Sequence, residues 1–228
     1  MNPSSVMLGI DATTGPCSVA LAVDGTVLSR VAHARRGQSA TILAFADELL
    51  AEAGIARPAV DAIACTRGPG SFTGVRISTG VGQGLAMGLD RPVVGLSTLQ
   101  VVAEAVLQAD AAPDGAVVLL DARMGEVYGG LFRRGAGTES TTVAVSAEWL
   151  GPPVSPSLPA GQWCGAGSGF AAYPPLAQAT GLTGVWSDCV PDMGAAMELA
   201  RHALARGDAI PAAELEPVYL RNRVARPA

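Results

Sequence analysis

The strongest constraint on the fold of this chain is an order of elements that occurs twice. An apolar run at residues 6–11 ends in an aspartate and leads through a glycine-containing turn to an extended run at 17–23 and the turn Asp24-Gly25. A second apolar run, at 117–121, also ends in an aspartate and precedes an extended run at 128–133 and a glycine turn. At an offset of 110 residues the identities are Asp11/Asp121, Ala12/Ala122, Gly15/Gly125 and Gly25/Gly135. We therefore predict two structurally related halves.

Hydrophobic periodicity extends this order along the first half. The predicted strands are 6–11, 17–23, 26–33, 60–66 and 93–96, and the predicted helices are 39–53, 71–88 and 98–109. The order is therefore β-β-β-α-β-α-β-α, which predicts an α/β fold. We expect one lobe at residues 1–110 and a second, more divergent lobe at 111–228.

The second half is less regular. Residues 139–149 predict a strand and a short helix, 151–159 a proline-rich loop, and 165–169 a glycine-rich segment that continues as a helix to about residue 180. A further helix is predicted at 192–206, with Asp192 as its N-cap and Gly207 at its end.

Composition excludes several function classes. The chain has 228 residues, 49% apolar side chains and a net charge of −5, so it can bury a large core and is not a general nucleic-acid coat protein. It contains no lysine, which excludes a P-loop and a Schiff-base enzyme. Its apolar stretches, such as 116–120, are far shorter than the roughly 20 residues of a membrane span. We expect a soluble cytoplasmic protein that does not bind membranes.

Histidine and cysteine usage argues against a metal centre. His33 and His202 are the only histidines, and no His-x-x-x-His or Cys-x-x-Cys spacing is present. We expect no metal site, no catalytic cysteine, and free buried thiols of a reducing compartment at the four cysteines. These are Cys17, Cys65, Cys164 and Cys189.

The turn after the first predicted strand has two interpretations. Backbone N–H groups and the hydroxyls of Thr13 and Thr14 between Asp11 and Gly15 are suited to a phosphate, and the Asp11 carboxylate to a magnesium ion. Alternatively, the same Asp and Thr side chains satisfy backbone groups of a hairpin turn. The residues alone favour the hairpin turn.

The predicted helix at 71–88 is unusually rich in glycine. It follows the loop Arg67-Gly-Pro-Gly-Ser71, and Ser71 or Thr73 can cap it. Each interior glycine costs about 1 kcal/mol relative to alanine, so roughly 3 to 5 kcal/mol must be offset, most simply by close backbone packing. The glycines are Gly74, Gly80, Gly82, Gly84 and Gly88.

Helical spacing arranges these residues into two rows. One row, at successive i+4 steps, contains Arg76, Gly80, Gly84 and Gly88; the neighbouring row contains Ile77, Val81 and Leu85. Such a face accepts another helix, either from this chain or from a partner. Because an arginine heads the first row, we favour a partner protein, with Arg76, Ile77, Gly80, Val81, Gly84 and Gly88 as its interface.

Two other sets of polar residues each have two interpretations. The segment Asp121-Ala-Arg-Met-Gly-Glu-Val-Tyr128 is either a ligand site or an Asp–Arg–Glu turn network. Several arginines could contact RNA phosphate, but none is interleaved with aromatic residues, so solvated faces are favoured. They are Arg30, Arg35, Arg36, Arg133, Arg134, Arg221, Arg223 and Arg226.

Four motifs resemble the TsaB (YeaZ) family of bacterial tRNA threonylcarbamoyladenosine synthesis. They are Ile10-Asp-Ala-Thr, Arg67-Gly-Pro-Gly-Ser-Phe-Thr-Gly-Val-Arg76, Asp121-Ala-Arg-Met-Gly-Glu-Val-Tyr128 and Pro217-Val-Tyr-Leu-Arg-Asn222. The resemblance is dense over residues 7–128, returns at 216–225, and is loose over 131–211. It implies a duplicated fold of the actin, Hsp70 and sugar-kinase (ASKHA) type.

The resemblance also implies a function. TsaB is a paralogue of TsaD, which transfers threonylcarbamoyl from threonylcarbamoyl-AMP to the adenosine 3′ of the anticodon in tRNAs that read ANN codons. TsaD holds its metal through a His-x-x-x-His motif, which this chain lacks. The expectation is a non-catalytic subunit that binds and activates TsaD, with no firm cofactor of its own.

The same resemblance implies an assembly. TsaE, an ATPase, joins the TsaB–TsaD pair; TsaB alone forms homodimers; and tRNA, ATP or ADP, and Mg²⁺ belong to the assembled complex. The contact helices of the family correspond here to residues 39–53 and 71–88.

Two other functions remain as alternatives at this point. An ATP-dependent kinase or ATPase of the same fold would use Asp11, Thr13 and Thr14. A peptidase is suggested by glycoprotease names given to relatives, and the missing metal motif argues against it.

Overall fold

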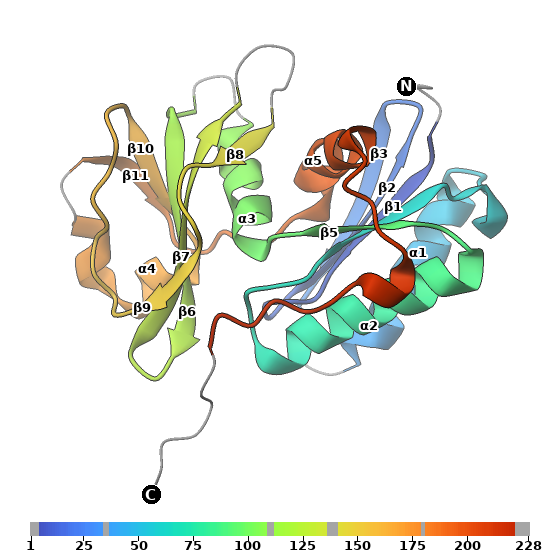
Figure 1. Cartoon of the computed structure of the whole chain (residues 1–228), viewed down its shortest axis with the longest axis horizontal. Helices are drawn as coiled ribbons and strands as arrows, with labels where there is room; N and C mark the ends of the chain where they lie inside the picture. The colour runs from blue at the N-terminus through green and yellow to red at the C-terminus, as the bar shows by residue number, and fades with distance from the viewer. Residues whose placement is uncertain (1–4, 34–36, 109–111, 136–140, 179–180, 222–228) are drawn as a thin grey trace, which may run out of the picture.

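The computed structural model describes residues 5–33, 37–108, 112–135, 141–178 and 181–221 (Figure 1). Two β-sheets lie side by side, each with helices on its faces. The first has the strand order β3-β2-β1-β4-β5. Its strands are β1 (Met7–Asp11), β2 (Cys17–Val23), β3 (Thr26–Ala32), β4 (Ala62–Thr66) and β5 (Val93–Leu96).

The second sheet has the order β11-β10-β6-β7-β8, and β9 also pairs with β7. Its strands are β6 (Gly115–Arg123), β7 (Glu126–Arg134), β8 (Thr142–Ala144), β9 (Trp149–Gly151), β10 (Trp163–Ala166) and β11 (Leu182–Trp186).

The two sheets share one topology. In the first, β1 is antiparallel to β2 and parallel to β4, which is parallel to β5. In the second, β6 is antiparallel to β7 and parallel to β10, which is parallel to β11. Matching β6 with β1 therefore superimposes strand order and direction. The prediction of two related halves is confirmed, and the fold is of the actin, Hsp70 and sugar-kinase type.

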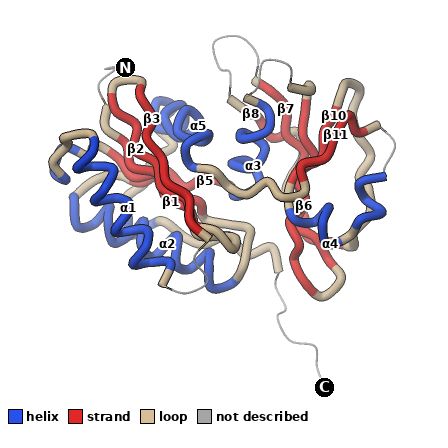
Figure 2. The backbone as a smooth tube through the Cα atoms, turned by 180° about the vertical axis from the view of Figure 1, so that it is seen from behind, coloured by secondary structure: helices blue, strands red, loops and turns tan. Residues whose placement is uncertain are grey.

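Five α-helices are present in the described part of the chain: α1 (Gln38–Glu52), α2 (Phe72–Leu89), α3 (Thr98–Leu107), α4 (Ser168–Ala172) and α5 (Met193–Arg206). Helices α1 and α2 cover one face of the first sheet and α5 covers the other (Figure 2). Helix α3 packs on the second sheet, with α4 on its opposite face. Strands β1–β5 form the first sheet and β6–β11 the second, whereas α3 packs on the second sheet and α5 on the first. The lobe boundary expected at residues 110–111 stays a prediction.

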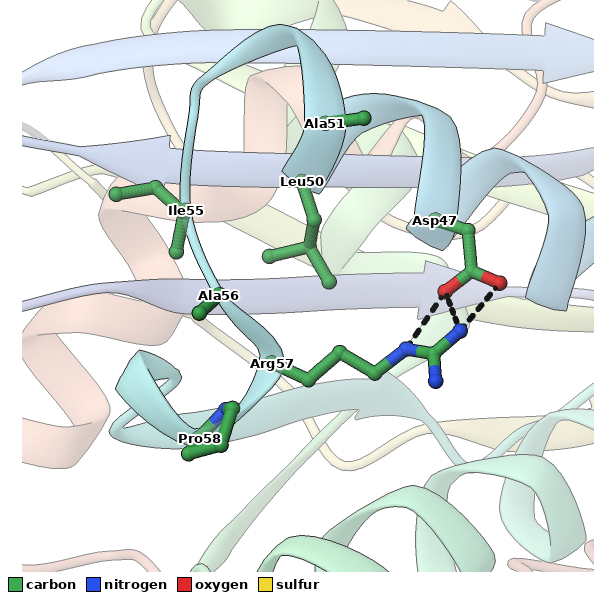
Figure 3. Close-up of a pocket in the computed structure, with 7 residues that line it drawn as sticks. All are labelled: Asp47, Leu50, Ala51, Ile55, Ala56, Arg57 and Pro58. Atoms are coloured by element: carbon green, nitrogen blue, oxygen red, sulfur yellow. Dashed lines mark hydrogen bonds and ion pairs between the residues drawn. The ribbon is translucent and has the colours of Figure 1, made fainter.

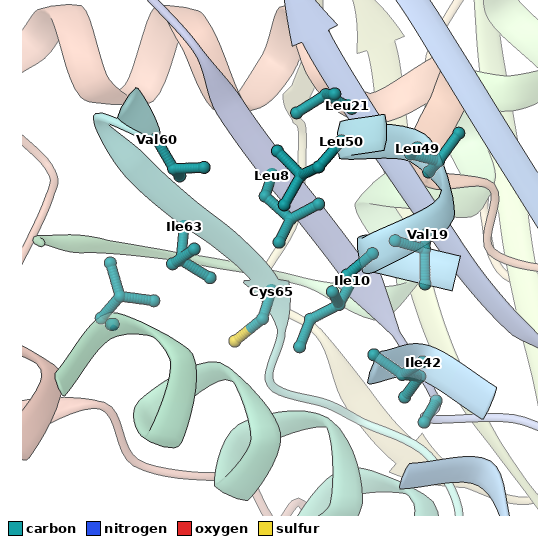
Figure 4. Packing of buried hydrophobic residues seen from close by; sticks show 14 of the residues in the cluster. Leu8, Ile10, Val19, Leu21, Ile42, Leu49, Leu50, Val60, Ile63 and Cys65 are labelled. Atoms are coloured by element: carbon teal, nitrogen blue, oxygen red, sulfur yellow. The ribbon is translucent and has the colours of Figure 1, made fainter. Parts of the chain in front are cut away.

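Strand alternation builds the core of the first lobe. Leu8 and Ile10 point toward α1 and α2, where they pack with Val19, Ile42 and Ile63 (Figure 4). On the opposite face of the sheet, α5 packs against Gly9 of β1. A Cβ at Gly9 would lie 2.6 Å from Met197 Sδ, so the small residue admits the methionines of α5.

The predicted helices of the first half agree with α1, α2 and α3 within two residues, and that at 192–206 agrees with α5. Both predicted N-caps are observed, because Gly74 N donates to Ser71 Oγ (3.1 Å) and Gly194 N donates to Asp192 Oδ1 (2.8 Å). Gly207 ends α5 with a φ of 83°.

Two predictions for the second half were wrong, and two strands were missed. The described part of 139–149 contains no helix, because this segment supplies β8 and the first residue of β9 to the edge of the sheet at β7. The helix expected to about residue 180 ends at Ala172, since two prolines follow and the chain continues as the 3₁₀ turn Pro174–Gln178. Strands β10 and β11 were not predicted.

The remaining expectations concern cysteines and membranes. All four cysteines are free, and Cys17, Cys65 and Cys164 are buried. Cys189 is only half-buried, so the expectation of four buried thiols holds for three. No helix among the residues that the structure describes is long and apolar enough to cross a membrane.

Candidate functional site

The four motifs that carry the family resemblance are connected by contacts around the start of α2 and the C-terminal segment. After the 3₁₀ turn Ala212–Glu214, residues 215–221 run beside α2 and reach the β6–β7 hairpin (Figure 1); we call them the C-terminal strap. Val218 N donates to the Arg67 carbonyl (2.7 Å). Arg221 forms an ion pair with Glu126 (2.6 Å). Segments from the two lobes and the C-terminus therefore form one cluster.

The Asp11 turn is a buried polar network. Asp11 is 1% exposed, and its Oδ1 accepts from Thr13 N (3.1 Å) and Thr13 Oγ1 (2.6 Å). Thr66 Oγ1 also donates to Oδ1 and lies 3.0 Å from Ser78 Oγ. Burial raises the pKa of Asp11 to about 6, against the opposing effect of these hydrogen bonds. Of the three Oδ1 contacts, two come from Thr13 within the turn and one comes from Thr66 on β4.

The N-terminus of α2 lies directly over this turn. Ser71 N donates to the Thr13 carbonyl (2.8 Å). A Cβ at Gly70 would lie 2.4 Å from Thr13 O, and one at Gly74 would lie 2.3 Å from Ala12 O. The start of α2 therefore packs closely against the Ala12 and Thr13 carbonyls of this turn.

Two polar atoms of the turn have no partner. Asp11 Oδ2 and Thr14 Oγ1 are buried and make no hydrogen bond within the described part of the chain. Gly15 is exposed, and Gln38 Nε2 donates to its carbonyl (3.0 Å). Of the four candidate residues, Asp11 and Thr13 are buried, Thr14 is half-buried and Gly15 is exposed.

The glycines of α2 divide into two groups. Gly74 packs on the Asp11 turn, and a Cβ at Gly82 would lie 2.9 Å from Cys65 Sγ. Gly80, Gly84 and Gly88 are exposed, and a Cβ at any of them would meet nothing within 4 Å. The fold therefore requires two of the five glycines and leaves three without a packing reason.

We call the exposed row of Arg76, Gly80, Gly84 and Gly88 the α2 face. The second predicted row is different, because Ile77, Val81 and Leu85 are half-buried and pack against the first-lobe core. Of the six predicted interface residues, Ile77 and Val81 therefore border the α2 face rather than stand free on it.

Arg76 lies at the first end of the α2 face between two aromatic rings. Its guanidinium stacks 3.7 Å from the centroid of Phe72, and its Nε donates to Tyr219 Oη (3.0 Å). Phe72 is 52% exposed and Tyr219 is 42% exposed. Sequence reasoning did not identify these two aromatics as functional, although both belong to the motifs quoted above.

The Asp121 segment forms a turn network, and its acids have separate partners. Arg123 N donates to Asp121 Oδ1 (2.8 Å), and the Arg123 side chain pairs with Oδ2 (3.0 Å). Glu126 instead pairs with Arg221 from the C-terminal strap. Arg123 and Met124 adopt positive φ angles of 62° and 57° at the hairpin.

A second polar contact joins the lobes. Ser97, the N-cap of α3, accepts from Gln100 N (3.2 Å) and donates to Glu148, which precedes β9. Burial raises the pKa of Glu148, whereas the Ser97 hydrogen bond and the nearby Arg67 charge lower it. No sequence motif pointed to Glu148, since its partners come from the other lobe.

The described candidate RNA-binding arginines have protein partners. Arg30 pairs with Glu52, Arg133 bonds the Ala160 carbonyl, Arg134 Nε donates to the Leu107 carbonyl (2.9 Å), and Arg221 pairs with Glu126. Arg35, Arg36, Arg223 and Arg226 lie outside the described residues. In the part of the chain that the structure describes, these arginines therefore hold other segments of the same chain.

Two shallow surface hollows occur on the first lobe. One, of about 490 Å³, lies at the end of α1, where Arg57 makes a two-pronged ion pair with Asp47 beside Leu50 and Ile55 (Figure 3). The other, of about 590 Å³, lies at the end of α2 beside Met87, which is 67% exposed. No group of three metal-ligating side chains occurs within the described ranges.

Comparisons with known proteins place this geometry in context. A family model described as TsaD, tRNA N6-adenosine threonylcarbamoyltransferase, matches residues 28–182. The tRNA threonylcarbamoyladenosine biosynthesis protein TsaB of Escherichia coli K12 is 35% identical over 96% of both chains. Its namesake from Haemophilus influenzae is 37% identical over 96% of this chain and 94% of its own.

A solved structure is also similar to this chain over nearly its whole length. It is described as an uncharacterized protein with similarity to peptidase YeaZ, from Pseudomonas aeruginosa. It superimposes with a TM-score of 0.87 at 37% identity and covers 95% of this chain and 100% of that chain. The similarity therefore spans both lobes.

Proposed function

This chain belongs to the TsaB family, and we propose that it acts in the biosynthesis of threonylcarbamoyladenosine in tRNA as a non-catalytic subunit. In this proposal it binds a TsaD-family transferase and makes it competent to transfer threonylcarbamoyl from threonylcarbamoyl-AMP to the adenosine 3′ of the anticodon. The family names of its relatives support the pathway. The match to the TsaD family model supports a paralogous partner.

The observation that carries the proposal is the α2 face. Three glycines on an exposed helix cost about 1 kcal/mol each relative to alanine, and no contact within the chain explains Gly80, Gly84 or Gly88. Glycines at i+4 steps allow a second helix to approach closely. A partner helix on this face would offset their cost.

The rest of the assembly follows from the same proposal. TsaE, an ATPase, joins the pair, and ATP or ADP with Mg²⁺ and the tRNA are bound by the complex in the cytoplasm. The chain alone forms a homodimer. An ATPase or kinase activity of this chain is the alternative, and the burial of Asp11 and Thr13 supports the subunit role over it.

The experiment is to place a bulky side chain on the α2 face. Gly84→Trp is compared with Ala205→Trp, which lies at an exposed position of α5, on the opposite face of the first sheet. Each variant is mixed with the TsaD-family protein, and co-elution and tRNA modification are measured together. Circular dichroism and melting temperature confirm that both variants fold.

We expect Gly84→Trp to abolish co-elution and modification and Ala205→Trp to retain both. Co-elution of Gly84→Trp at the wild-type level would show that the interface lies elsewhere. Calorimetry of the isolated chain with ATP and Mg²⁺ tests the alternative, since tight binding with turnover would favour a kinase or ATPase.

A further inference from the structure

The C-terminal strap is fixed firmly to the first lobe at its start. Leu215 is 1% exposed and packs in the first-lobe core. Gln83 Nε2 donates to its carbonyl (2.9 Å), and Val218 N donates to the Arg67 carbonyl (2.7 Å). Gly68 and Gly95 leave room for it, because a Cβ at Gly68 would lie 2.6 Å from Val218 O and one at Gly95 would lie 3.2 Å from a Leu215 methyl.

The strap is fixed to the second lobe at its end. The Arg221 side chain is 14% exposed, and its guanidinium forms an ion pair with Glu126 Oε2 (2.6 Å). The same group donates to the Ala122 carbonyl (3.0 Å) and contacts Met124 Sδ (3.6 Å). One half-buried charge therefore holds the turn of the β6–β7 hairpin.

Tyr219 lies between these two anchors and borders the α2 face. Its hydroxyl accepts from Arg76, which heads that face, and its ring lies 6.0 Å from Phe72. Only Leu220 separates Tyr219 from Arg221, so their α-carbons are at most about 7 Å apart in an extended chain. The contacts to Arg76 and to Glu126 are therefore made from one short segment of the strap.

We propose that the C-terminal strap couples the α2 face to the second lobe, so that partner occupancy of the face and the position of the β6–β7 hairpin depend on each other. This inference rests on the proposed function, because the occupant is the TsaD-family transferase. Arg221 is a positioning residue that acts through Glu126. The coupling is reciprocal, as linkage between two sites requires.

The test is a double-mutant cycle of Arg221→Ala and Glu126→Ala, with Arg123→Ala as the matched control. The Arg123 side chain is 87% exposed on the same hairpin and pairs only with Asp121 among the described residues, so its loss leaves the strap attached. Affinity for the TsaD-family protein is measured for each variant. Amide hydrogen exchange at Val218 and over residues 122–127 is measured with and without the partner.

We expect each single variant at positions 221 and 126 to weaken partner affinity about ten-fold, the double variant to be no weaker than either, and Arg123→Ala to match the wild type. Val218 exchanges faster in Arg221→Ala, and partner binding no longer slows exchange in the hairpin. Arg221→Lys, which keeps the charge, restores part of the affinity.

Additive losses in the cycle would show that Arg221 touches the partner directly and would overturn the inference. Unchanged Val218 exchange in Arg221→Ala would overturn it without any partner present. Failure of the wild-type chain to bind the transferase would instead reject the proposed function. The exchange measurement on the free chain keeps these two failures distinct.

Discussion

The α-carbon of Gly74 lies so close to Ala12 that an added Cβ would come within 2.3 Å of the Ala12 carbonyl oxygen. Helix α2 therefore begins directly on the turn that follows β1, and Ser71 N closes the contact by donating to the Thr13 carbonyl (2.8 Å). This relationship separates glycines that the fold needs from glycines that it does not. It also helps to bury the first residues of the Asp11 turn, from Asp11 to Thr13.

Two alanine substitutions in one helix should therefore have opposite effects. Gly74→Ala places a methyl group against backbone, so we expect it to lower the free energy of unfolding by about 1–3 kcal/mol. Gly80→Ala adds a methyl group in open space, so we expect a gain of about 1 kcal/mol and a rise of roughly 2–4 °C in Tm. Urea unfolding and thermal melts of the two variants check this. Equal effects would contradict the division of the α2 glycines.

The raised pKa of Asp11 predicts a specific pH dependence of stability. The folded pKa is about 6 and the ordinary value is 3.8, so between these values the folded chain holds a proton that the unfolded chain releases. Stability from this group is therefore highest below the lower value and falls by about 3 kcal/mol as pH rises through the window. Asp11→Asn does not titrate and lacks this slope. Denaturant titrations from about pH 4 to 7 should show the two proteins diverging, and parallel curves would refute the assignment.

Thr66 should matter more when Asp11 is charged. Its hydroxyl donates to Asp11 Oδ1, so Thr66→Val removes a hydrogen bond to a buried carboxylate. We expect a loss of about 1.5–3 kcal/mol above the pKa of Asp11 and a smaller loss below it. Thr66→Ser keeps the donor and is the matched control. A loss that does not vary with pH would mean that the cost comes from packing alone.

The Arg57–Asp47 pair beside the α1 hollow should contribute little to stability. Its side chains are 67% and 53% exposed, so solvent screens the interaction despite its 2.8 Å separation. Arg57→Ala should change the free energy of unfolding by less than about 1 kcal/mol, measured in urea. Raising the salt concentration should reduce even this difference. A larger loss would indicate that the Arg57 stem supports α1 by packing.

Local signals were sufficient for much of the first lobe. Ser71 and Asp192 are N-caps because a short polar side chain precedes each apolar period, and both hydrogen bonds are present. The i+4 spacing likewise identified the row from Arg76 to Gly88 before any contact was known. These features depend only on residues of the same helix, so the spacing of residues along the sequence is enough to predict them.

The second lobe was harder to predict for a physical reason. Strand β10 consists of Trp163-Cys-Gly-Ala166, a composition with weak intrinsic strand preference, and it forms because β6 and β11 pair with it on both sides. Strand β9 similarly depends on its pairing with β7. Such pairings join residues far apart in the sequence and leave no local pattern.

The sequence by itself determined the duplicated strand order, the helix ends, and the absence of lysine and of paired histidines, since these depend on residue identity and spacing along the chain. Only the tertiary structure decided which glycines of α2 remain uncovered, that Glu126 pairs with Arg221 rather than Arg123, and that Tyr219 lies against Arg76. Contacts between segments more than 90 residues apart arise from how two lobes and a C-terminal segment pack together. That packing depends on the free energy of the whole chain, which no single motif determines.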